Sequence, residues 1–124
     1  MFHFFKLVVI SCCILGGPYA LADGKVIYES ICANCHSKLF MNSPQLGEKK
    51  AWAPLISEGQ IIITAHGFVG VRAMPPKGGR VDLTLNQFSD ALNYMVNKSG
   101  GDWKTPSKEQ FEAIKVEILK RGNR

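Results

Sequence analysis

Two cysteines separated by two residues, Cys32 and Cys35, are followed directly by His36. Residues three apart on a helical turn share a face, so both thiols can reach one edge of a porphyrin. The imidazole that follows is a good axial ligand for haem iron. The spacing therefore predicts one covalently attached haem c, bound through Cys32 and Cys35 with His36 on the iron.

The same pair of cysteines has two other interpretations. A thioredoxin-like redox site requires a βαβ pattern around the motif, and the sequence shows none. A zinc site requires four ligands, whereas the exported chain offers these two cysteines, His36 and His66. Both interpretations are weaker than haem attachment.

A second iron ligand is predicted at Met74 in the segment 71–79, where Pro75 and Pro76 follow the methionine and two glycines follow Lys77. Proline forces the residue before it out of helical geometry, so Met74 is expected in a stiff extended loop. A thioether fixed in this way is poorly explained as core and well explained as a ligand, and Met/His ligation fills both axial positions.

Three other side chains are candidates for the second ligand. His66 is the alternative, although a packing or hydrogen-bonded role is expected for it. Met41 is too close in sequence to His36 to reach the opposite face of a haem. Met95 falls on a predicted helix and is expected in the core.

Segment 37–51 is predicted to be a loop, and Trp52 beyond it is expected to pack in the interior, with the haem as one candidate partner. A ligating histidine usually gives its other ring N–H to a carbonyl or carboxylate. Because proline keeps a carbonyl but has no N–H, we expect the Pro54 carbonyl to hold His36.

Apolar spacing and capping residues predict four helices. Gly24, in the first predicted helix (23–31), would let another helix cross closely, since it has no side chain. The last helix has two possible starts, at a capping Thr105 or at a Ser107–Gln110 capping box. It is expected to pack back on the domain, with partner docking as the alternative. The predicted ranges are 23–31, 57–66 ended by Gly67, 84–97 capped by Thr84, and about 105–122.

Residues 1–22 have the pattern of an export signal: a positive Lys6, an apolar stretch over 7–15 and a small-x-small site ending at Ala22. The mature chain is then expected to begin at Asp23, in the periplasm, without a transmembrane anchor. A lipoprotein signal at Cys12 is a weaker alternative. Removal of this segment would leave only the cysteines of the haem motif, so no structural disulfide is expected.

The chain has 15 Lys and Arg against 10 Asp and Glu, a formal net charge of +5. This excess is too mild to indicate nucleic acid, and it is compatible with docking to an acidic protein partner or with an ordinary solvated surface. The residues predicted to form a basic rim are Lys38, Lys49, Lys50, Lys77 and Arg80.

Taken together, the motifs resemble a class I c-type cytochrome, close to the bacterial cytochrome c-five subgroup, over roughly residues 23–98. Some relatives carry a second cysteine pair after the Gly-Gly turn, and segment 80–83 occupies that place here. The residues that carry the resemblance are Gly24, Lys25 and Tyr28, the motif 32–36, segment 54–56, the loop 73–79, and Tyr94 with Met95.

The resemblance implies an all-α, small class I cytochrome c fold for residues 23–99, with an additional C-terminal helix in the extension 100–124. It implies a monomeric, non-enzymatic electron carrier that docks transiently on redox partner proteins. The alternatives are a haem enzyme with an open distal site, a sensor with a displaceable distal methionine, and a subunit of a larger complex.

Overall fold

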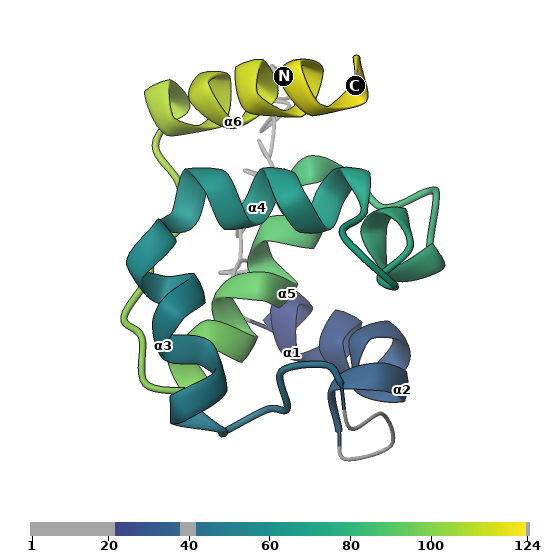
Figure 1. The fold of residues 1–124 in the computed structure, drawn as a ribbon, viewed down its shortest axis with the longest axis vertical. Helices are drawn as coiled ribbons and strands as arrows, with labels where there is room; N and C mark the ends of the chain where they lie inside the picture. The colour runs from purple at the N-terminus through teal and green to yellow at the C-terminus, as the bar shows by residue number, and fades with distance from the viewer. Residues whose placement is uncertain (1–21, 38–41, 124) are drawn as a thin grey trace, which may run out of the picture.

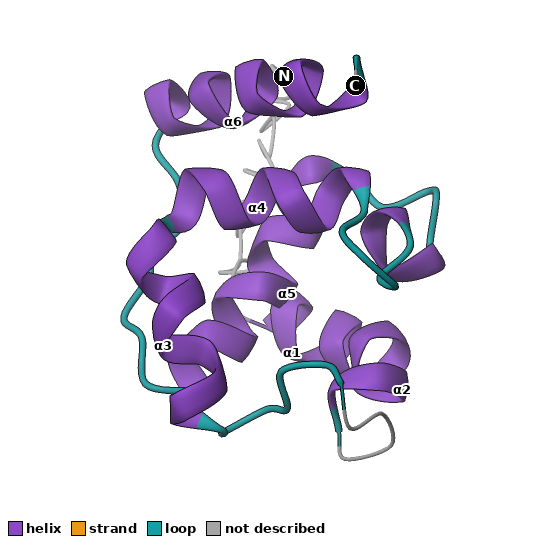
Figure 2. Cartoon of the chain, viewed as in Figure 1, coloured by secondary structure: helices purple, strands orange, loops and turns teal. Residues whose placement is uncertain are grey.

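The computed structural model describes residues 22–37 and 42–123. Nearly all of the expected export signal, together with Lys38 and Met41, lies outside these residues. The expected all-α fold is confirmed, because the regular elements of the described residues are helices (Figure 2). The elements are α1 (Ala22–Ile27), η1 (Tyr28–Cys32), α2 (Ala33–His36), α3 (Lys49–Glu58), α4 (Gln60–Val69), η2 (Pro76–Gly79), α5 (Leu85–Lys98) and α6 (Lys108–Gly122). An isolated antiparallel bridge pairs Val71 with Met74 in the loop after α4.

The segment that carries the haem motif is one continuous helical run made of α1, η1 and α2. Its middle part, η1, is a π-helical turn that ends at Cys32, and π-turns of this kind are frequent at functional sites. Gly24 lies where α1 crosses α5, because a Cβ there would stand 2.4 Å from the Asp90 carbonyl oxygen. The expected close crossing is therefore confirmed.

Helix α5 forms the centre of the fold (Figure 1). Thr84 and Gln87 make the capping box that starts it, so the predicted start is confirmed. Its apolar face is buried, and Tyr94 packs on Tyr28 of η1 with ring centroids 5.4 Å apart. The buried apolar core includes Tyr28, Trp52, Ile63, Leu83, Phe88, Leu92, Met95 and Val96.

The prediction of a helix over 57–66 is wrong at both ends. Ser57 belongs to α3, and α4 begins only at Gln60. Gly67 was expected to end a helix over 57–66, but α4 runs on to Val69 and ends at Gly70, whose φ is +92°. Gly67 lies inside α4. A Cβ there would stand 2.6 Å from the Phe88 ring, so the glycine leaves room for that ring. Glycine serves close packing at one position and chain reversal at the other.

Helix α6 lies along α4, as expected for a helix that packs back on the domain (Figure 1). It begins at the Ser107–Gln110 capping box rather than at Thr105, and Ile114 on its inner face has no exposed surface. The connection from α5 is tied down by the Asn97 side chain, which bonds both the N–H and the carbonyl of Trp103 at 2.7 and 2.8 Å.

Across residues 22–37 and 42–123, none of the helices is both long enough and apolar enough to traverse a membrane.

Candidate haem site

The two cysteines of the motif lie at the junction of η1 and α2 and neither is in a disulfide. Cys32 is buried, and this burial raises the pKa of its thiol to about 11. Cys35, one helical turn further on, is exposed. Residues three apart on a helical run share a face, so the two thiols can still reach one edge of a macrocycle although one is buried and the other exposed.

His36 ends α2 and is buried. Its Nδ1 donates to the carbonyl oxygen of Pro44 at 2.7 Å. This contact fixes the ring and its tautomer and leaves Nε2 as the nitrogen that would bind iron.

The expectation that the Pro54 carbonyl holds His36 is wrong. Pro54 lies inside α3, where the carbonyl runs along the helix axis, and the predicted loop over 37–51 stops earlier because α3 begins at Lys49. Pro44 lies in the loop that returns toward α2, where the Leu46 N–H also bonds the His36 carbonyl at 2.8 Å. A proline carbonyl does hold His36, but it belongs to Pro44.

Two hydrogen bonds, at Gln45 and Gly47, hold the loop that carries Pro44 against the core. Trp52 of α3 is buried, lies with its ring centroid 6.3 Å from that of His36, and donates from Nε1 to the Gln45 carbonyl at 2.9 Å. The Gly47 N–H donates to the hydroxyl of the fully buried Ser99 at 2.9 Å. Sequence reasoning missed Ser99, since nothing local indicates a contact across fifty residues.

Met74 lies in a short loop closed on itself. Its N–H and carbonyl pair with those of Val71 at 2.9 and 3.0 Å. The side chain is half-buried, and its Cε would be 3.6 Å from a Cβ at Gly67, so it rests against α4. A Cβ at Gly78 would lie 3.5 Å from Ile31, which places this loop against the helical run that carries the cysteines.

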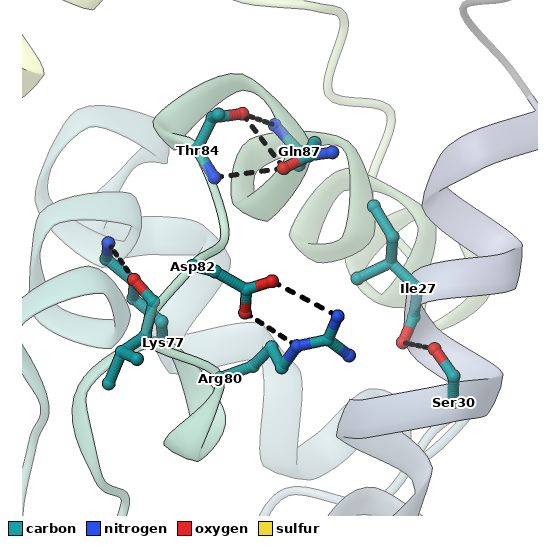
Figure 3. A network of polar contacts seen from close by, with 8 residues as sticks. Ile27, Ser30, Lys77, Arg80, Asp82, Thr84 and Gln87 are labelled. Carbon is teal, nitrogen blue, oxygen red and sulfur yellow. Dashed lines mark hydrogen bonds and ion pairs between the residues drawn. The ribbon is translucent and has the colours of Figure 1, made fainter.

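Two of the five predicted rim charges are already engaged. Arg80 makes two contacts with the Asp82 carboxylate, at 2.6 and 3.2 Å, and this hydrogen bonding lowers the pKa of Asp82 (Figure 3). The Lys77 ammonium lies over the Phe68 ring, 4.5 Å from its centroid. Lys49 and Lys50 remain exposed at the start of α3.

His66 lies on the side of α4 that faces α6. Burial lowers its pKa, the charge of Arg121 lowers it further, and Glu58 and Glu117 act in the opposite direction. Its Nε2 is buried without a hydrogen-bond partner. This position fits the expected packing role, because Arg121 and Glu117 belong to α6 rather than to the Met74 loop.

The residues present fit a covalently bound haem. Two free thiols stand one turn apart, a buried imidazole is oriented by a carbonyl, and a half-buried thioether lies on a second element. In the described part of the chain, no three His, Cys, Asp or Glu side chains gather in a way that could hold a metal ion by themselves. Half-buried apolar side chains around the core, suited to line a macrocycle, include Ile31, Leu46, Leu55, Phe68 and Met74.

Comparison with known proteins identifies similar cytochromes. The family model for subunit III of cbb3-type cytochrome c oxidase matches residues 20–95. Cytochrome c-555 of Chlorobaculum thiosulfatiphilum is 40% identical over 85 residues, a match that covers 65% of this chain and 99% of the relative. Cytochrome c5 of Azotobacter vinelandii is 28% identical over 75 residues, covering 59% and 90%.

A solved structure is also similar. A chain in the crystal structure of an electron transfer complex of nitrite reductase with cytochrome c superposes with a TM-score of 0.60 at 35% identity, covering 63% of this chain and 95% of that chain. Helix α6 lies beyond the family match. The chain thus belongs to the family that this model describes, and it is a class I monohaem c-type cytochrome: a haem-binding electron carrier whose cofactor is covalently attached haem c.

Proposed function

We propose that this chain shuttles single electrons between redox proteins, with haem attached through Cys32 and Cys35 and iron held by His36 and Met74. The observation that carries the proposal is the contact of His36 Nδ1 with the Pro44 carbonyl at 2.7 Å. Metal-bound histidines almost always donate their second nitrogen in this way, and the partner sets the ring orientation.

The bound haem supplies reversible one-electron chemistry at its iron. Of the chain's own residues, Pro44 orients the His36 imidazole, and half-buried apolar side chains would surround the group. His36 and Met74 would both hold the iron and so would leave no position on it for a substrate. For this reason we propose an electron carrier rather than an enzyme.

The ligand assignment is tested by Met74→Leu, with Met95→Leu as the matched control because Met95 is buried in the core of α5. The ferric form of the Met74 variant should become high-spin, and its ferrous form should bind carbon monoxide. The control should keep the spectrum of the unmodified protein. Identical spectra for the Met74 variant and the unmodified protein would contradict the assignment.

Attachment is tested separately, by replacing Cys32 and Cys35 together with serine. We expect haem to remain with the unmodified chain on a denaturing gel and to be lost from the double variant. Haem retained by the double variant under denaturing conditions would show that other atoms hold it.

We further propose that the chain is exported to the periplasm with cleavage after Ala22, and that it acts as a monomer. The support is the charged, apolar and small-residue pattern of residues 1–22. The intact mass of the purified protein is expected to correspond to residues 23–124 plus one haem, and light scattering should give the mass of one chain. A mass that includes residues 1–22 would contradict the cleavage.

Docking on an acidic partner is assigned to Lys49 and Lys50. Both are exposed in the first turn of α3, which contains no acidic residue, and the positive end of the helix dipole adds to their potential. The solved relative in a complex with nitrite reductase supports docking on a redox protein in general.

The double reversal Lys49→Glu and Lys50→Glu should slow electron exchange with an acidic partner and weaken its dependence on salt. The same change should slightly stabilise α3, because acidic residues suit a helix N-terminus. A slower rate with an unchanged or higher melting temperature would separate docking from folding. An unchanged rate and salt response would contradict the assignment.

The description of the family model names an oxidase subunit, which favours a second candidate function: a subunit of a larger complex. Val116 and Leu119 are exposed on the outer side of α6, 51% and 66% respectively, and are the residues to change. If α6 docks on such a complex, lysine at both positions should abolish co-purification while the spectrum stays the same. Purification as a single chain from native membranes and soluble extract would exclude this function.

A further inference from the structure

Lys77 has a backbone conformation that is uncommon for a residue with a side chain. Its φ and ψ are +54° and +28°, in the left-handed region, and the neighbouring Gly78 has a φ of +67°. Such a conformation persists only where the surroundings hold it in place. The contacts of the Lys77 side chain show what does so here.

The half-buried side chain of Lys77 makes two contacts with its ammonium group. Nζ lies 4.5 Å from the centroid of the Phe68 ring, within the range of a favourable cation–π contact. The same Nζ donates to the Val81 carbonyl oxygen at 2.9 Å, one of the dashed contacts in Figure 3. One side chain thus joins α4 to the turn that follows the Met74 loop.

Phe68 belongs to the wall on which Met74 rests. It packs edge-on against Phe88, with ring centroids 5.8 Å apart. The preceding residue, Gly67, is the position whose added Cβ would meet Phe88 at 2.6 Å and the Met74 methyl group at 3.6 Å. The ammonium of Lys77 therefore reaches the structural unit that backs the thioether.

We propose that Lys77 is a positioning residue for the distal thioether, acting as a clasp between the Met74 loop and α4 rather than as a docking charge. The inference rests on the proposed ligation of iron by Met74. Loss of the clasp leaves His36 and both cysteines in place but lets the loop move away more easily. External ligands then compete with the thioether more successfully.

The test uses the ferric holoprotein and imidazole as the external ligand, which binds iron only when the thioether leaves. Lys77→Met keeps a long apolar side chain and removes the ammonium. Lys98→Met is the matched control: it makes the same charge change at a lysine whose Nζ lies 5.8 Å from the Tyr94 ring, on α5. Lys77→Arg keeps the positive charge over the ring.

We expect Lys77→Met to tighten imidazole binding about tenfold, the effect of losing one cation–π contact and one hydrogen bond. Lys98→Met and Lys77→Arg should bind imidazole as the unmodified protein does. Equal affinities for the Lys77→Met and Lys98→Met variants, whether changed or not, would overturn the proposal, because the contacts of Lys77 would then contribute nothing beyond the charge.

Phe68→Leu provides a second route if the Lys77 variant assembles poorly, since it removes the ring and keeps apolar packing. It should also tighten imidazole binding, and adding Lys77→Met to it should have a smaller effect than in the unmodified protein. Fully additive effects would overturn the clasp. Absence of a methionine–iron charge-transfer absorption in the unmodified ferric protein would instead refute the ligation by Met74, so the two failures are distinguishable.

Discussion

The crossing of α1 and α5 gives the sharpest prediction about the fold, through Gly24→Ala. An added Cβ would stand 2.4 Å from the Asp90 carbonyl oxygen, 2.8 Å from its carbon and 3.4 Å from the Ala91 nitrogen. Comfortable contacts between heavy atoms lie near 3.5 to 4.0 Å. Because all three neighbours are backbone atoms, no side chain can rotate away, and the helices must separate by about 1 Å to restore such contacts.

The expected loss follows from two opposing effects. Overpacking of this kind lowers the free energy of unfolding by about 1 to 3 kcal/mol. Alanine in place of glycine inside a helix returns roughly 0.5 to 1 kcal/mol. Since the clash is with backbone, we expect a net loss of about 2 kcal/mol, or a melting temperature lower by roughly 10 °C in a domain of about this size.

The assay is guanidinium unfolding of the holoprotein followed by far-ultraviolet circular dichroism. Gly122→Ala is the matched control, because nothing lies within 4 Å of a Cβ at that last residue of α6. Its stability should stay the same or rise slightly. If both variants unfold at the same denaturant concentration, the close crossing at Gly24 is refuted.

The remaining predictions concern buried polar groups. Thr64→Val should keep or raise stability by up to about 1 kcal/mol in denaturant unfolding, because the Thr64 hydroxyl is buried without a partner; a clear loss would reveal a partner. Trp52→Phe removes the hydrogen bond to the Gln45 carbonyl and should lower the free energy of unfolding by about 1 to 2 kcal/mol. It should also shift the reduction potential, measured by redox titration. An unchanged stability and potential would show that the loop does not depend on that bond. The lowered pKa of His66 means that the folded state favours neutral imidazole, so its contribution is fully present above the ordinary value of 6.5 and is lost as the pH falls below it. Thermal unfolding should show this loss in the unmodified protein and less of it in His66→Gln, and equal pH dependence in both would contradict the assignment.

Local signals predicted the parts of this protein that depend on local chemistry. Thr84 caps α5 as expected, because a cap depends on residues within one turn. The absence of a side chain at Gly24 indicated a close crossing, and the structure places the Asp90 carbonyl there. The covalent haem expected from the spacing of Cys32, Cys35 and the following histidine agrees with the family to which the chain belongs.

Features that depend on long-range packing could not be predicted in the same way. A proline carbonyl was expected for His36, but choosing Pro44 over Pro54 requires the path of the loop. Likewise Gly67 and Gly70 look alike in sequence, although one makes room for Phe88 and the other reverses the chain. In both cases the residue type was informative and its partner was not.

Charged residues show the same limit. The sequence places Lys77 in a basic docking rim on its charge alone, whereas its ammonium contacts Phe68 and the Val81 carbonyl. The sequence contains no signal that separates such a lysine from Lys49, which stays exposed. Only the fold brings the aromatic ring beneath the charge.

The optical spectrum of the unmodified, purified protein in both oxidation states tests the central claim most directly. We expect a low-spin ferric form with a methionine–iron charge-transfer absorption, and a ferrous form that does not bind carbon monoxide at neutral pH. A high-spin ferric spectrum, or ready binding of carbon monoxide, would show that Met74 does not close the iron and would contradict the account.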